Sequence, residues 1–289
     1  MKISTSPKRA DVSSSESFAL SFRQILASCK KAGFQVLDLN LAQYTRTHSP
    51  LVESGWEDWL KQLNEITIDS GLEWSQGHAH FVNWEQEDLN SWEFHDELVR
   101  RSIVGAGMMG VKTLVVHPKT YPDAAWYSRK SSLNANLESF KRYGEWAAPY
   151  DLTIAVENLS EKRVGRRFGT GPEELLELVE LLNDPLFAIC WDTGHAHISG
   201  INQVEALHMI GPHLKAVHIS DNRGAEDEHL MPLAGTIQWE PLIRALREVE
   251  YSGDFTFEVI YRSQGEPYRL YDLFVETLYE LGSHLLELA

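Results

Sequence analysis

The sequence predicts an α/β fold in which one (β/α)8 barrel accounts for all 289 residues. Eight β-rich runs alternate with stretches that can form helices, and no Pro-, Gly- or Ser-rich linker divides the chain. Six consecutive runs also end on, or close to, a residue type that binds metal ions. A single barrel of this length is ordinary, so we expect one domain that spans residues 1–289.

The eight expected strands follow one another with about one helix between each pair. They cover Lys2–Thr5, Phe34–Leu39, Leu72–His78, Thr113–His117, Leu152–Glu157, Phe187–Asp192, Ala216–Ser220 and Phe255–Val259. Strands separated by helices pair in parallel through right-handed crossovers, and eight such units close most simply into a barrel. An open doubly wound sheet is the competing fold. The first strand lacks the GxGxxG motif typical of that fold, and the polar strand ends favour closure.

The stretches between the strands carry the marks of helix ends and loops. Residues 171–179 read GPEELLELV, in which Pro172 suits a first helical turn, acidic residues follow it, and leucines recur at helical spacing. Gly33, Gly110 and Gly253 precede strands, where the glycine that ends a helix is expected. The stretches Lys119–Ser132 and Glu161–Thr170 are interpreted as active-site loops.

Charge and composition exclude several classes of partner. The net charge is −16, and such a field repels the backbone of nucleic acids unless a local basic patch overcomes it. One short basic cluster is interpreted as a solvated loop, with an anion clamp for substrate as the alternative; it contains Lys162, Arg163, Arg166 and Arg167. The opening residues contain no apolar run of the length that a secretory signal needs, and no segment approaches the roughly 18 apolar residues of a membrane span. We therefore expect a cytoplasmic protein with no membrane or nucleic-acid partner, and a homo-oligomer is left open.

The two cysteines, Cys29 and Cys190, lie far apart in the sequence and have no metal-binding spacing. This arrangement argues against a disulfide framework. Cys190 lies within an apolar run, so we expect a small buried side chain there.

The strongest candidate site is formed by four charged or polar residues that interrupt or end apolar runs. They are Glu157 in IAVENL, Asp192 in AICWDTGHAH, His218 in AVHISDN and Glu258 in FTFEV. Any one of them alone would be an ordinary salt-bridged or capping residue. Four successive strands with the same feature predict a site for a divalent cation, because gathered carboxylates repel one another unless a cation offsets their charge.

A second set of residues could add metal ligands or bind substrate. It comprises His78, His80, His117, His195 and the run from Asp227 through Glu228 to His229. The remaining histidines are expected on helices or outer loops without a role in the site; they are His48, His95, His208, His213 and His284.

Several motifs together resemble the sugar phosphate isomerase/epimerase group of xylose-isomerase-like TIM barrels, a superfamily that also contains endonuclease IV. They are IAVENL, CWDTGHAHISG, AVHISDN, FTFEV and the DxHLxPLxGTIxW run from Asp227 to Trp239. The resemblance extends from the third expected strand to the eighth. It is specific at the level of the superfamily.

The epimerase branch of this resemblance implies one divalent metal ion held by Glu157, Asp192, His218 and Glu258. Mn²⁺ or Zn²⁺ is the expected ion, with Mg²⁺ or Co²⁺ as further options. Glu157 and Glu258 would also serve as catalytic acid and base. The expected substrate is a small sugar or sugar phosphate, with contacts assigned to His195, His80, Lys119, Trp126 and Arg223.

The endonuclease branch implies three zinc ions and a larger set of ligands. All nine positions have matches, at His78, His117, Glu157, Asp192, His195, His218, Asp227, His229 and Glu258. The chain departs from both branches. Gly224 stands where the epimerase pattern has an arginine, with Arg223 one position earlier, and Pro118 follows His117 where the nuclease continues Gly-Ser-His. The acidic net charge favours the sugar enzyme.

The expected reaction is proton transfer next to a carbonyl group through a metal-stabilised enediolate, which gives isomerisation or epimerisation. Three alternatives stay open: an endonuclease IV-like zinc phosphodiesterase at abasic DNA, a metal-dependent lyase on a keto-glycoside, and a metal-binding protein without turnover. Aromatic side chains in the expected loops could stack on sugar faces or only cover the core; they are Phe81, Trp84, Tyr121, Trp126 and Tyr127.

Overall fold

The computed structural model describes residues 1–10, 15–46, 48–82, 91–123, 126–161, 166–261 and 268–288. Its strands are β1 Ile3–Thr5, β2 Val36–Asn40, β3 Glu73–His78, β4 Thr113–Val116, β5 Pro122–Asp123, β6 Trp126–Tyr127, β7 Thr153–Glu157, β8 Phe187–Asp192, β9 Leu214–His218 and β10 Phe255–Phe257. Its α-helices are α1 Ser15–Ala32, α2 Trp56–Asp69, α3 Trp92–Met108, α4 Arg129–Ala147, α5 Pro172–Leu182, α6 Thr193–Ile198, α7 Gln203–Ile210, α8 Trp239–Glu248 and α9 Tyr268–Glu287. Three short 3₁₀ helices are η1 Leu41–Tyr44, η2 Ala148–Tyr150 and η3 Gly211–His213.

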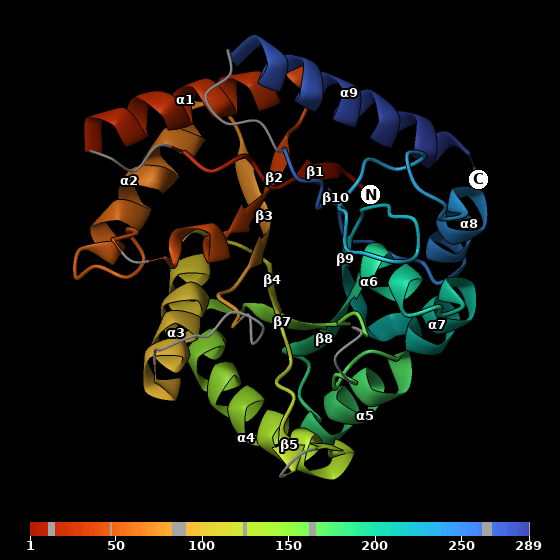
Figure 1. The fold of residues 1–289 in the computed structure, drawn as a ribbon. Coiled ribbons are helices and arrows are strands. Elements are labelled where there is room, and N and C mark those ends of the chain that lie inside the picture. The colour runs from red at the N-terminus through yellow and green to blue at the C-terminus, as the bar shows by residue number, and fades with distance from the viewer. Residues whose placement is uncertain are drawn as a thin grey trace.

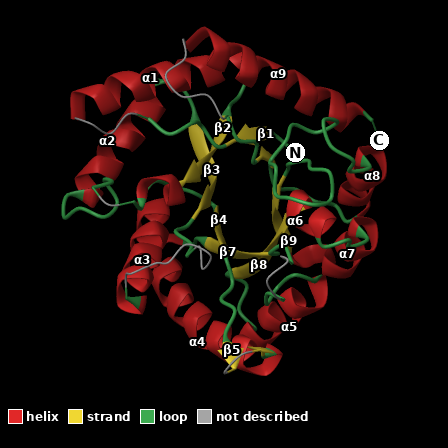
Figure 2. Ribbon diagram, in the orientation of Figure 1, coloured by secondary structure: helices red, strands yellow, loops and turns green. Residues whose placement is uncertain are grey.

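Parallel strands surround a central axis, and the helices form an outer layer (Figures 1 and 2). Six strands form one sheet in the order β2-β3-β4-β7-β8-β9, and β1 pairs in parallel with β10 in a second sheet. A parallel bridge between Ile219 and Phe257 links the two sheets beside β9. Among the described residues β1 and β2 form no ladder, so hydrogen-bonded closure of all eight strands is not observed.

The strand predictions from the sequence agree closely with the structure. Each of the eight expected runs overlaps a parallel strand, and the ends differ by at most two residues. The reason is visible in β8, where all six residues are buried, because strands covered on both faces are nearly continuous apolar runs. The added hairpin β5-β6 is antiparallel and lies in the loop between β4 and α4.

The helix-end predictions are confirmed in part. Pro172 occupies the first position of α5, and Gly33 and Gly110 have φ angles of 115° and 76°, as expected after a helix. The prediction for Gly253 is wrong, because α8 ends at Glu248 and the left-handed residue after it is Glu250, with φ 54°. Position 253 requires a glycine because there is no room for a side chain. A Cβ there would lie 2.4 Å from the Tyr251 hydroxyl oxygen and 2.7 Å from the Lys215 carbonyl oxygen.

No helix in the part of the chain that the structure describes combines the length and the apolar character needed to cross a membrane. The longest helices, α9 and α4, carry polar and charged residues throughout. Cys29 and Cys190 are both free, and Cys190 is buried as expected; Cys29 is buried as well.

Candidate metal centre

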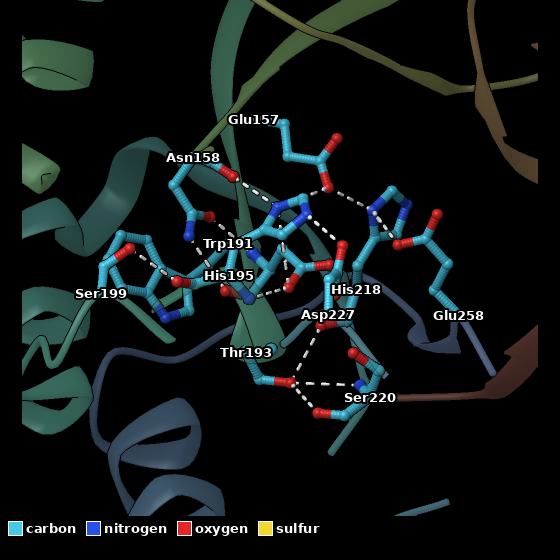
Figure 3. A network of polar contacts seen from close by, with 12 residues as sticks. Glu157, Asn158, Trp191, Thr193, His195, Ser199, His218, Ser220, Asp227 and Glu258 are labelled. Atoms are coloured by element: carbon cyan, nitrogen blue, oxygen red, sulfur yellow. Dashed lines mark hydrogen bonds and ion pairs between the residues drawn. The ribbon is translucent and has the colours of Figure 1, made fainter. Parts of the chain in front are cut away.

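The four predicted ligands meet at the carboxyl ends of neighbouring strands. Glu157, Asp192 and His218 are the last residues of β7, β8 and β9, and Glu258 directly follows β10. One potential ligand atom from each lies within 4.8 Å of the others, close enough to share an ion. Figure 3 shows the side chains of Glu157, His218 and Glu258 pointing toward one another. Parallel strands place their carboxyl ends at the same edge, which is why residues up to 101 positions apart converge.

Three atoms of this group, Glu157 Oε2, Asp192 Oδ2 and His218 Nε2, are buried without a hydrogen-bond partner among the described residues. Asp192 Oδ1 accepts a hydrogen bond from the backbone N–H of His195 at 2.6 Å, but Asp192 Oδ2 has no partner. His218 Nε2 is also buried without one. Because unpaired buried acceptors are costly, Asp192 Oδ2 fits the role of a ligand to a cation. The donor set of three carboxylates and one imidazole suits a hard or borderline divalent ion.

Two further histidines contact Glu157 from the strands on its other side. His78, at the end of β3, and His117, just after β4, place Nε2 at 3.3 and 2.8 Å from Glu157 Oε2. Neither contact has the geometry of a hydrogen bond to Glu157 Oε2. Together His78, His117 and Glu157 form a second group whose ligand atoms lie within 4.8 Å of one another.

Three more predicted residues form an outer cluster around one carboxylate. Asp227 Oδ2 lies 3.3 Å from Nε2 of His195 and 3.3 Å from Nε2 of His229. His195 Nδ1 donates to the Asn158 carbonyl oxygen at 2.8 Å, and His229 Nδ1 donates to the Glu258 carbonyl oxygen at 2.8 Å. These backbone bonds leave Nε2 of both rings directed at Asp227.

The neighbouring charges push the pKa values of the two deepest carboxyls apart. Burial alone would raise the pKa of Glu157, but His218 and His117 outweigh it and hold that pKa well below its ordinary value. Burial raises the pKa of Asp192 to about 7, and the nearby carboxylates add to the rise although His195 opposes it. Burial opposes protonation of His218, yet Cys190, Glu157 and Glu258 raise its pKa well above the ordinary value.

We predict that metal affinity rises with pH across neutrality. Below about pH 7 Asp192 holds a proton and His218 is charged, so an entering cation must displace these protons. For each proton that the metal displaces, the apparent metal affinity falls about tenfold when the pH is lowered by one unit. Calorimetric titration of metal-free protein with Mn²⁺ from about pH 6 to pH 8, in two buffers of different ionisation enthalpy, measures the affinity and the proton release. Equal affinity across that range would contradict the prediction.

A cavity of about 750 Å³ opens beside the cluster. Its wall includes His78, His117, His195, Asp227 and Glu258 on the side of the metal ligands. Other lining residues come from α3, α4 and two loops, and include Trp92, His95, Asp96, Lys119, Tyr121, Tyr143, Arg166 and Arg167. Glu258 therefore reaches the cavity directly, whereas Glu157 is fully buried behind the histidines.

The predicted substrate-binding residues are distributed unevenly around this cavity. His80 lines it and places Nε2 2.9 Å from Nδ1 of His95, and Lys119 lines it with Nζ 3.3 Å from Asp96 Oδ1. Arg223 is not among the lining residues, because it follows Asn222 in an exposed turn, is 60% exposed and pairs with Glu228. The side chain of Trp126 lies outside the described part of the chain, as do Trp84, Lys162 and Arg163.

Several residues of the cavity had no role in the sequence analysis. His95 was expected to have none, but it stacks on His80 with ring centroids 5.2 Å apart. Asp96 and Tyr143 are helical residues. The direction in which they face depends on how α3 and α4 pack, and the sequence carries no signal for it.

Glu174, buried on α5, joins the two predicted active-site loops. It accepts hydrogen bonds from the Tyr127 hydroxyl, from Arg166 Nη2 at 3.1 Å and from the Gly169 backbone N–H at 2.9 Å.

Asp221 holds the loop that carries Asp227 and His229. Its buried carboxylate accepts four hydrogen bonds, from the backbone N–H groups of Asn222, Leu233 and Ile237 and from the Trp239 indole N–H, all between 2.9 and 3.2 Å. These bonds connect the end of β9 to the start of α8.

We predict that Asp221→Ala lowers the free energy of unfolding by about 3 kcal/mol, because four buried donors lose their acceptor. Denaturant unfolding followed by circular dichroism measures the change. The matched control is Asp58→Ala, which removes a carboxylate that is 85% exposed and should change the stability by less than about 0.5 kcal/mol. Equal effects of the two substitutions would refute the anchoring role.

The fold and the site define a class: an α/β protein of parallel strands with a cluster of buried carboxylates and imidazoles at their carboxyl ends. The chain belongs to the xylose isomerase-like TIM barrel family, whose model matches residues 26–277. The resemblance noted in the sequence is thereby confirmed.

Among curated relatives, the chain is similar to the uncharacterized protein MJ1311 of Methanocaldococcus jannaschii, with 33% identity over 186 residues. That match covers 63% of this chain and 62% of MJ1311, so the chain spans less than two thirds of the relative's length. It is also similar to the probable endonuclease 4 of Acholeplasma laidlawii, with 21% identity over 73% of this chain and 76% of that protein.

Solved structures share the fold over almost the whole chain. A D-tagatose 3-epimerase-like protein has a TM-score of 0.72 at 25% identity, covering 99% of this chain and 97% of that one. The IOLI protein with a bound zinc atom has a TM-score of 0.72 at 19% identity, covering 99% and 98%.

Proposed function

We propose that this protein is a divalent-metal-dependent enzyme that isomerises or epimerises a sugar or sugar phosphate by moving a proton next to a carbonyl group. The observation that carries the proposal is the four-ligand group of Glu157, Asp192, His218 and Glu258 at one edge of a 750 Å³ cavity. The epimerase-like structural neighbour supports the same class of substrate. The proposed metal is Mn²⁺ or Zn²⁺, and the zinc-bound neighbour supports the second.

The roles of the side chains follow from their positions. A bound divalent cation would act as a Lewis acid on the carbonyl and adjacent hydroxyl oxygens of the substrate. Glu258, which lines the cavity, and Glu157 would remove and return the proton at the neighbouring carbon. His195 lines the cavity with Nε2 3.3 Å from Asp227 Oδ2, and as an imidazolium it would donate from Nε2 to a substrate oxygen. Phe81 and Trp92 would exclude water from the reacting carbon.

The direct test combines elemental analysis of the purified protein with a panel of keto and aldo sugars and their phosphates in deuterated water. The expected result is one tightly bound divalent ion per chain and deuterium incorporated at the carbon next to a carbonyl. Chelator-treated protein is the control and should incorporate none. A metal-loaded protein that labels no sugar of the panel would overturn the proposed reaction.

A zinc phosphodiesterase at abasic DNA is the second candidate. The group formed by His78, His117 and Glu157 favours it, because it offers ligands for an additional ion, and the similarity to a probable endonuclease 4 points the same way. The net charge of −16 opposes it. Cleavage of an abasic duplex by zinc-loaded protein would decide in its favour. A lyase acting on a keto-glycoside would use the same enolate and would show release of the leaving group.

We also propose that β1 and β10 complete a single eight-stranded barrel. The bridge from Ile219 to Phe257 and the ring of strands in Figure 2 support this arrangement.

A further inference from the structure

The barrel interior one layer below the metal centre has two chemically different halves. The inward-facing residues of this layer lie one or two positions before the last residue of each strand. On β4, β7, β8 and β9 they are Val115, Ala155, Cys190 and Ala216, which form a separate buried apolar cluster. On β10, β1, β2 and β3 they are Thr256, Ser4, Asp38 and Gln76, all at most 3% exposed.

The strand register places these four polar residues in two neighbouring pairs. Ser4 pairs with Thr256, and Asp38 pairs with Gln76. Ser6, two residues beyond Ser4, donates a hydrogen bond from its hydroxyl to Asp38 Oδ2. This bond joins β1 to β2 at the place where the two strands share no ladder.

Each residue of the polar half has a buried side-chain atom without a hydrogen-bond partner among the described residues. The atoms are Ser4 Oγ, Asp38 Oδ1, Gln76 Nε2 and Thr256 Oγ1, and Asn40 Oδ1 in the layer above is a fifth. Native interiors leave few such groups unpaired, and unpaired groups gathered in one place are typical of an internal hydration site. Donors and acceptors are both present, so a water molecule can make several bonds there.

This layer also faces the back of a proposed metal ligand. His218 Nδ1 lies 2.7 Å from Glu157 Oε1 and 3.4 Å from Glu258 Oε2, so this nitrogen points into the ligand group. The other nitrogen, Nε2, is buried without a partner. An imidazole that binds a metal through Nδ1 carries its hydrogen on Nε2 and needs an acceptor for it. The His218 ring stacks on the His78 ring with centroids 5.5 Å apart, and His78 pairs in register with Asn40, two residues beyond Asp38. Asp38 is therefore a candidate acceptor, because it lies on the strand next to β3, one layer below, and its Oδ1 is buried without a partner among the described residues.

We propose that the polar half of the barrel holds ordered water, and that Asp38 accepts the Nε2–H of His218 through this water. Asp38 is thus a positioning residue: it fixes the orientation of the imidazole, while the side chain itself does not reach the cavity. The proposal rests on the metal centre of the proposed function. It assigns a role to the one carboxylate of this layer, which the proposed reaction does not use.

The test compares Asp38→Asn with Val115→Ala, a substitution in the apolar half of the same layer. The expected result is that Asp38→Asn weakens the binding of Mn²⁺ and Co²⁺ by about 10- to 100-fold. It should also alter the visible absorption spectrum of the Co²⁺-loaded protein, which reports on ligand geometry. Val115→Ala should leave the affinity and the spectrum unchanged. A crystal structure of the wild type should show ordered water bonded to Ser4, Asp38 and Thr256.

The outcomes separate this proposal from the proposed function. Wild-type affinity and an unchanged spectrum in Asp38→Asn would overturn the positioning role, and so would equal changes in Asp38→Asn and Val115→Ala. A wild type that binds no metal would instead refute the metal centre itself. If Asp38→Asn does not fold, Ser6→Ala replaces it, because this variant frees Asp38 Oδ2 from its one side-chain hydrogen bond. An unchanged Co²⁺ spectrum in Ser6→Ala would then overturn the proposal.

Discussion

Glu258→Gln should slow the exchange of the substrate proton with solvent by about 10³-fold, within the range that a positioned acid or base contributes. The amide keeps the shape of the side chain but can neither take up nor return a proton. Glu258 is the carboxylate of the ligand group that lines the cavity, so its loss removes the group with direct access to substrate. Glu157→Gln should have an effect of similar size, because the return of the proton needs a second group.

Deuterium incorporation followed by mass spectrometry, at saturating metal, measures both variants. Metal content determined on the same samples separates lost catalysis from lost binding. Glu240→Gln is a matched control, since Glu240 lies on the exposed face of α8 in an ion pair with Arg244. Full exchange in both Glu157→Gln and Glu258→Gln would show that the assigned acid and base roles are wrong.

Removal of the metal should abolish activity and lower the free energy of unfolding by about 2.7 kcal/mol relative to protein held at 100 times the metal dissociation constant. A ligand that binds only the folded state stabilises it by mass action. His218→Ala should make the stability independent of added metal, because it deletes the single imidazole of the four-ligand group.

Thermal unfolding with and without Mn²⁺ and a chelator measures this dependence. His208→Ala is the control: this side chain is an exposed partner of Glu248 and should leave the metal effect intact. A metal-dependent rise in stability that persists in His218→Ala would place the ion elsewhere. If removal of the metal lowers the thermal stability but leaves the activity unchanged, the ion stabilises the fold and the reaction does not need it.

The convergence of the four candidate ligands could be predicted from the sequence because each of them interrupts or follows an apolar run. Glu157, Asp192 and His218 are the last residues of their strands, and a charged residue at the end of a buried strand is visible in the chain itself. The same reasoning could not place Arg223. The resemblance to the epimerase pattern suggested a substrate role, because Arg223 stands one position before the arginine of that pattern. In the structure the side chain pairs with Glu228 and is 60% exposed.

The sequence by itself determined the order of strands and helices, the parallel arrangement and the residues able to bind an ion, because burial on both faces produces apolar runs whose ends are marked by polar residues. Only the tertiary structure decided which helical residues line the cavity, as with His95 and Tyr143. It also decided that Asp38, a charge within a strand, faces the barrel interior rather than a polar exterior. The physical reason is that a local sequence pattern indicates whether a residue is buried. Which elements bury it depends on the packing of segments that are distant in the chain.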